Sequence, residues 1–148
     1  MWRINKANMC AAALSLVAIM AAPFHAWAGQ PERVTVTGEV IDPWCYLSEI
    51  MWATGSAHHQ CAIWCARGGI PVGILGDDEQ VYIVLQMDSD PDVIGHHGIL
   101  RMQSNEVVVE SDLYVRDNIN YLAIDTIIDD HGIVNYSHDE FEIQPFGD

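Results

Sequence analysis

The sequence predicts a mainly β protein built as a five-stranded barrel of the OB type. Residues 34–41 are rich in β-branched side chains and alternate with period two, which is typical of a strand. Four further strand-like stretches follow, and a helical stretch separates the third strand from the fourth. This order of elements matches an OB barrel. A generic antiparallel β-sandwich is the competing architecture.

Local signals set the expected bounds of each element. The strands are expected at residues 34–41, 71–75, 80–87, 106–115 and 121–128, with an edge strand at 141–143. Asp42-Pro43 ends the first strand, and residues 48–56 form a loop or a short helix. A helix is expected over residues 57–67, with Ser56 as its N-cap and Gly68-Gly69 at its end. A second, irregular helix is expected from Asp90 to about Met102.

The first 28 residues have the pattern of a secretory signal peptide. Arg3 and Lys6 precede an apolar run over residues 10–22, and Ala26-Trp27-Ala28 has the small-residue spacing of a cleavage site. We therefore expect a periplasmic or secreted protein with no stable membrane insertion after cleavage. Residues 29–148 would form a single OB-like domain, with an insertion at residues 42–70. An uncleaved N-terminal anchor is the alternative.

The charge balance excludes some partners. All 21 acidic residues follow residue 28, where only four arginines oppose them. Proteins bind nucleic acid largely through Lys and Arg contacts to phosphate, so nucleic acid is not an expected partner. Cations, metal ions and basic protein surfaces suit such a chain better.

Three cysteines and a histidine are concentrated in the expected insertion. On a helix over residues 57–67, His58, Cys61 and Cys65 would fall within about 60° of one another. His59 would point elsewhere and is the weaker candidate ligand. Adding Cys45 completes a Cys3His set, which suits one transition metal ion, either zinc or copper(I). The predicted metal ligands are therefore Cys45, His58, Cys61 and Cys65.

The number of cysteines favours metal binding over a simple disulfide. Removal of Cys10 with the signal peptide would leave three cysteines in an oxidising compartment, where disulfides use them in pairs. A metal site would use all three. A bond from Cys45 to one of the other two, leaving a spare thiol, stays open as an alternative.

The same region resembles a group of small exported bacterial proteins of uncharacterised function. The resemblance covers residues 36–75 and rests on Gly38-Glu-Val-Ile-Asp42-x-x-Cys45-Tyr46 followed by His58-x-x-Cys61-Ala62-x-x-Cys65-Ala66-x-Gly68-Gly69-Ile70-Pro71. It implies a shared OB-like fold and a shared site. It implies no reaction.

These observations predict an exported metal-binding protein for metal transfer, storage or sensing. A metal ion is the expected partner, and another exported protein is a further candidate. Two alternatives stay open: a thiol–disulfide redox or assembly protein using Cys61 and Cys65, and a non-metal binding module acting through the acidic surface. A Cys-His nucleophile pair would lack an identifiable orienting residue, which favours a binding protein and leaves the question of an enzyme open.

Overall fold

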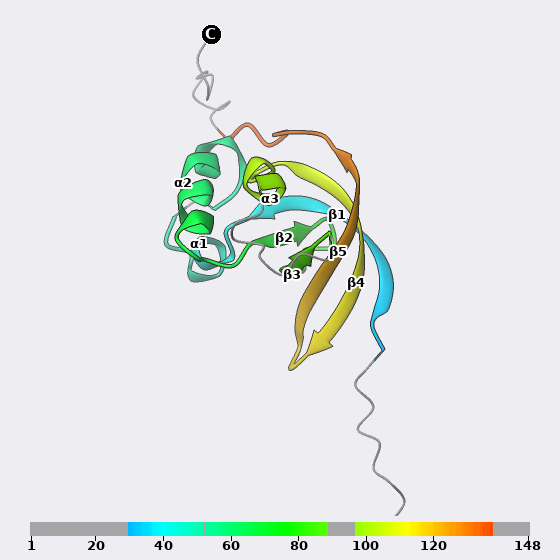
Figure 1. Cartoon of the computed structure of the whole chain (residues 1–148). Helices are drawn as coiled ribbons and strands as arrows, with labels where there is room; N and C mark the ends of the chain where they lie inside the picture. The colour runs from blue at the N-terminus through cyan, green and yellow to red at the C-terminus, as the bar shows by residue number, and fades with distance from the viewer. Residues whose placement is uncertain (1–29, 52, 89–96, 138–148) are drawn as a thin grey trace, which may run out of the picture.

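Five strands form the framework of the chain. They are β1 (Glu32–Ile41), β2 (Gly73–Gly76), β3 (Val81–Met87), β4 (Glu106–Arg116) and β5 (Ile119–Asp130). Three helices connect them: α1 (Pro43–Ser48), α2 (Gly55–Arg67) and α3 (His97–Arg101). The computed structural model describes residues 30–51, 53–88 and 97–137 (Figure 1).

The strands close into a barrel in the order β1-β2-β3-β5-β4. All neighbouring strands pair antiparallel except β3 and β5, which pair in parallel from Tyr82 with Asn120 to Met87 with Ile124. This parallel pair joins the β1–β3 meander to the β4–β5 hairpin and closes the sheet on itself. The predicted five-stranded OB-like barrel is confirmed, and the β-sandwich is excluded.

Alternating side chains from the strands fill the barrel. On β4, Val107, Val109 and Ser111 are fully buried, while the residues between them are half-buried. This period-two pattern places one face of each strand in the core. The core cluster consists of Val36, Val40, Ala66, Val72, Ile74, Tyr82, Val84, Met87, Ile99, Met102, Val107, Val109, Leu122 and Ile124.

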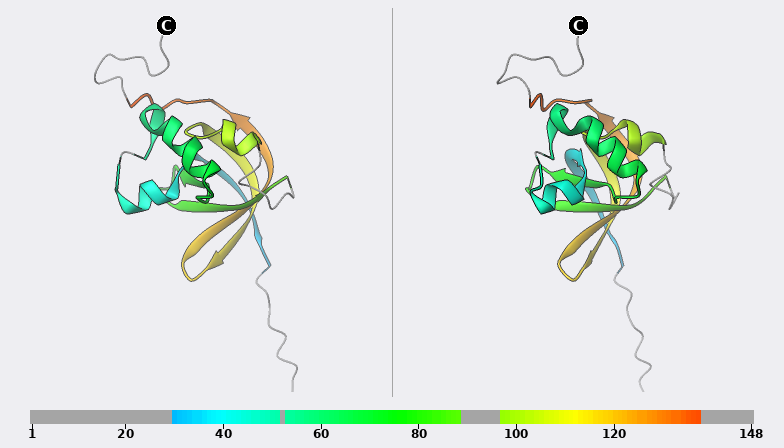
Figure 2. Two further views of the ribbon diagram at one scale, coloured as in Figure 1. Left: turned by 60° about the vertical axis from the view of Figure 1, so that its left-hand side comes forward. Right: turned by 90° about the vertical axis from the view of Figure 1, so that its left-hand side faces the viewer.

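Both α1 and α2 belong to the connection between β1 and β2, as expected for the insertion. They lie beside one end of the barrel, while the β4–β5 hairpin extends at the other end (Figures 1 and 2). Ala62 and Ala66 of α2 are buried, and Ala66 belongs to the core cluster. The small side chain of Ala66 allows α2 to pack against the core of the barrel. In the described part of the chain, no helix is long and apolar enough to cross a membrane.

Some element boundaries differ from the expected ones. The last two strands are joined by a two-residue turn, Asp117-Asn118, and not by the five-residue link expected at residues 116–120. Both turn residues have positive φ, 52° and 63°, which matches the twist of a tight hairpin. The expected helix start at Asp90 and the edge strand at residues 141–143 lie outside the described residues.

A glycine is required at position 38, where β1 lies between strands β2 and β4. It pairs with Gly76 of β2 and Val107 of β4. A Cβ atom at Gly38 would overlap the Leu75 carbonyl oxygen and lie 2.7 Å from the Cα of Gly76. Both neighbours are backbone atoms of the barrel, so neither can move aside easily.

We therefore expect Gly38→Ala to lower the free energy of unfolding by about 1–3 kcal/mol, the usual cost of overpacking. Urea unfolding of the purified protein would measure it. Gly68→Ala is the matched control, because Gly68 has a φ of −78° and a Cβ there would lie 3.3 Å from its nearest neighbours. Its effect should stay within about 0.5 kcal/mol. Equal losses in the two variants would contradict the argument.

Candidate metal centre

Asp42 positions the first part of the site, at the junction between β1 and α1. Its Oδ1 accepts hydrogen bonds from the backbone N–H groups of Trp44 (2.9 Å) and Cys45 (3.2 Å). Pro43 occupies the first helical turn, where its missing N–H group costs nothing. The residues predicted to end the first strand therefore also start a helix. Cys45, only 4% exposed, is held in the first turn of that helix.

Contacts from distant parts of the chain hold the N-terminus of α2. The Gly55 N–H group donates to Oε1 of Glu39 on β1 (2.5 Å), and the Ser56 N–H group donates to the carbonyl oxygen of Asn135 (2.8 Å). The helix begins at Gly55, with Thr54 in the N-cap position and no hydrogen bond from the Thr54 side chain. The expectation that Ser56 is the N-cap was wrong, because a carboxylate from β1 takes that role.

The C-terminus of α2 ends as the glycine pair predicts. Gly69 has a φ of 98°, its N–H group donates to the Ala66 carbonyl (3.1 Å), and the Ile70 N–H group donates to the Cys65 carbonyl (3.0 Å). This pair of hydrogen bonds is a Schellman motif. It turns the chain from α2 back toward β2 one turn after Cys65.

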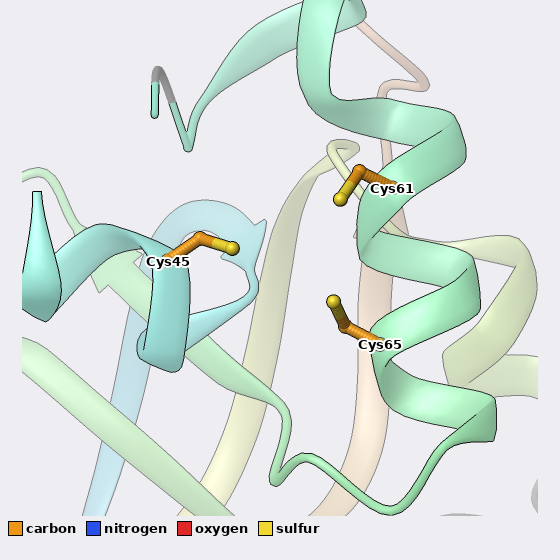
Figure 3. Close-up of side chains that lie close together, drawn as sticks. All are labelled: Cys45, Cys61 and Cys65. Atoms are coloured by element: carbon orange, nitrogen blue, oxygen red, sulfur yellow. The ribbon is translucent and has the colours of Figure 1, made fainter. Parts of the chain in front are cut away.

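The three cysteines converge between α1 and α2. Cys61 and Cys65 lie one turn apart on α2, and their sulfur atoms point toward that of Cys45 on α1 (Figure 3). The three sulfur atoms lie within 4.8 Å of one another, and all three thiols are free. Cys45 is buried, whereas Cys61 and Cys65 are half-buried. The geometry thus provides three soft donors that one cation can contact together.

A second group of possible ligands adjoins the first. One ligand atom each from Asp42, Cys45 and His58 lie within 4.8 Å of one another, and all three residues are buried. Nε2 of His58 lies 3.8 Å from Oδ2 of Asp42. Neither atom has a hydrogen-bond partner, although both are buried. Such atoms are rare in folded proteins because removing a polar group from water without a partner is costly.

The structure brings the four predicted ligands into one region but divides them between two groups. Cys45, Cys61 and Cys65 form one group, and His58 joins Cys45 in the other. His59 lies outside both groups, and its Nδ1 lies 2.7 Å from the Gln103 carbonyl oxygen.

Asp42 was missed as a possible ligand. An aspartate before a proline has a sufficient local explanation as the end of a strand. Its position three residues before Cys45 was the only available signal, and spacing alone does not show that a side chain is buried beside a histidine.

The charges in the cluster depend on one another. Burial opposes ionisation of Asp42, but the nearby thiols of Cys65 and Cys45 and two backbone N–H groups outweigh it and lower the carboxyl pKa. Burial and the Asp42 carboxylate raise the pKa of Cys45 to about 11. The Asp42 carboxylate and burial raise the pKa of Cys65 as well. At neutral pH a metal ion must therefore displace protons from these thiols, so metal affinity should rise with pH.

An apolar groove of about 760 Å³ lies beside α1 but is separate from the cluster. Its walls include Pro43, Trp44, Ile70 and Ile119, and none of the possible metal ligands lines it. Trp44 is 62% exposed. The groove therefore adjoins the helix that carries Cys45 without opening onto the thiols.

Comparison with family models, with curated proteins and with solved structures finds no match to this chain.

The raised pKa of Cys45 predicts that the metal-free protein loses stability as pH rises from about 9 to about 11. In this range the unfolded chain, with an ordinary thiol pKa of 9.0, loses a proton that folded Cys45 retains. Unfolding is therefore favoured, by about 1–3 kcal/mol at the upper limit. Urea unfolding at pH 8, 9 and 10 would measure it.

Cys45→Ala is the control for this measurement. The substitution should lower stability at every pH because it leaves a cavity, but the alkaline decline should be shallower. Cys65 and Tyr82, whose pKa values are also raised, remain in the variant and should leave a part of the alkaline decline in both proteins. Identical declines in the two proteins would show that Cys45 does not carry the effect.

Proposed function

We propose that this chain is an exported metal-binding protein that takes up a transition metal ion for transfer, storage or sensing. The observation that carries the proposal is the convergence of three free thiols, from two different helices, within 4.8 Å of one another. Three sulfur donors favour a thiophilic ion, and zinc and copper(I) are the best candidates. Cys45, Cys61 and Cys65 are the proposed sulfur ligands, and His58, which joins Cys45 in the adjoining group, is the proposed nitrogen ligand of the cluster.

The surroundings of the thiols favour a site that exchanges its metal. Cys61 and Cys65 are only half-buried, so a cation or a partner's ligand can reach them from solvent. The chain carries a formal net charge of −15, which raises the concentration of cations near its surface. A structural zinc ion enclosed by the protein would need neither solvent-accessible thiols nor a negatively charged surface. Export, proposed from the first 28 residues, would bring this site to metal ions outside the cytoplasm.

The first test is elemental analysis together with a thiol count on the reduced protein, purified without oxygen. We expect bound zinc or copper, and thiols that react with a thiol reagent only after a chelator removes the metal. Cys45→Ser should lower zinc affinity at least about a hundredfold, since it removes a ligand that both groups share.

His59→Ala is the matched control, because it removes a histidine of the same helix that lies outside both groups. Its zinc affinity should equal that of the wild type. A reduced wild-type protein that retains neither zinc nor copper would refute the proposed function.

The same geometry supports thiol–disulfide exchange as a second candidate function. The sulfur atoms of Cys61 and Cys65 are close enough that a modest local movement would allow a bond, and a disulfide of another exported protein would be the oxidant. On this hypothesis, metal-free protein isolated without reductant should release two additional thiols on mild reduction. Release of no additional thiol would rule out this second candidate function.

A further inference from the structure

We propose that the cluster holds two metal ions and that Cys45 bridges them. The outer position consists of Cys45, Cys61 and Cys65, and the inner position consists of Asp42, Cys45 and His58. This inference rests on the proposed metal-binding function and adds a second ion and a fifth ligand, Asp42.

The unpartnered atoms of Asp42 and His58 are the first argument for the inner position. Oδ1 of Asp42 is used by the N-terminus of α1, whereas Oδ2 makes no geometric hydrogen bond, and the thiols of Cys45 and Cys65 lie near the carboxylate. The side chains of His58 and Asp42 are 2% and 1% exposed, so bulk solvent does not reach either atom. Their separation of 3.8 Å is too long for a hydrogen bond. Two metal–ligand bonds of about 2.1 Å each can bridge it.

The two groups also differ in the ions that they suit. The outer position has three sulfur donors, which favour a soft cation such as copper(I) or a zinc ion. The inner position offers one oxygen, one nitrogen and one sulfur, a set typical of a borderline divalent cation such as zinc or cobalt. His58 is not grouped with Cys61 and Cys65, so a single four-coordinate ion would not contact all three of these residues. One ion therefore does not account for all the donors of the cluster.

Charge balance is the third argument. With metal bound, the thiolates of Cys45, Cys61 and Cys65 and the carboxylate of Asp42 supply four negative charges in a small volume. A single divalent ion would leave two of them uncompensated near the protein interior, which is costly. Two divalent ions balance all four.

Cobalt(II) titration of the reduced, metal-free protein tests the proposal. Cobalt is used because its thiolate complexes absorb light, so bound ions and thiolate ligation are measured together. We expect two equivalents of cobalt in the wild type, confirmed by elemental analysis after gel filtration. His59→Ala should also bind two, since His59 belongs to neither position.

Removing an inner ligand should remove one ion only. Asp42→Asn and His58→Ala should each bind one equivalent and retain the strong absorption of the three-thiolate position. Asparagine caps helices as well as aspartate does, so the first variant should keep α1 in place. His58→Ala decides the matter if Asp42→Asn does not fold. The double variant Cys61→Ser, Cys65→Ser should also bind one equivalent, with weaker absorption from a single thiolate.

Two results would overturn the second position. One is a single equivalent of cobalt in the wild type, and the other is retention of both equivalents in Asp42→Asn and His58→Ala. A wild-type protein that binds no cobalt, zinc or copper would instead refute the proposed function as a whole. The failure of the inner position and the failure of metal binding are therefore distinguishable.

Discussion

The buried carboxylate of Asp42 is the constraint on which the rest of the site depends. It lies where β1 leaves the barrel, and its Oδ1 satisfies two N–H groups of the first turn of α1. Without that acceptor, α1 would lose its start and Cys45 would lose its orientation toward α2. Burial and this carboxylate raise the pKa of Cys45, and the carboxylate and burial raise the pKa of Cys65. One side chain thus contributes both to the position of the central thiol and to its raised pKa.

The barrel supports the other half of the site through α2. Glu39 from β1 and the segment after β5 bind the N-terminus of the helix, and a Schellman motif ends it at Gly69. Ala62 and Ala66 of the helix are buried, and Ala66 belongs to the core cluster of the barrel. The positions of Cys61 and Cys65 therefore depend on residues from both ends of the described chain. A site supported in this way is more rigid than one placed on a free loop.

The possible ligands differ in how deeply they are buried. Cys61 and Cys65 are half-buried, Cys45 is buried, and Asp42 and His58 are almost fully enclosed. An ion would reach the sulfur pair first, and Cys45 belongs to both the accessible and the enclosed group. This gradient of exposure is consistent with the metal uptake proposed above. None of these ligands lines the apolar groove beside Trp44.

The sequence alone determined the succession of the five strands along the chain. It also determined the helix that carries Cys61 and Cys65 and the glycine pair that ends this helix. These features follow from side chains that are neighbours along the chain, so local patterns were enough to predict them. Only the tertiary structure decided the rest. The parallel pairing of β3 with β5, the capping of α2 by Glu39 and the burial of Asp42 beside His58 all join residues that are distant in sequence. No local pattern reports such contacts, because they form only when the barrel closes and brings the insertion against it.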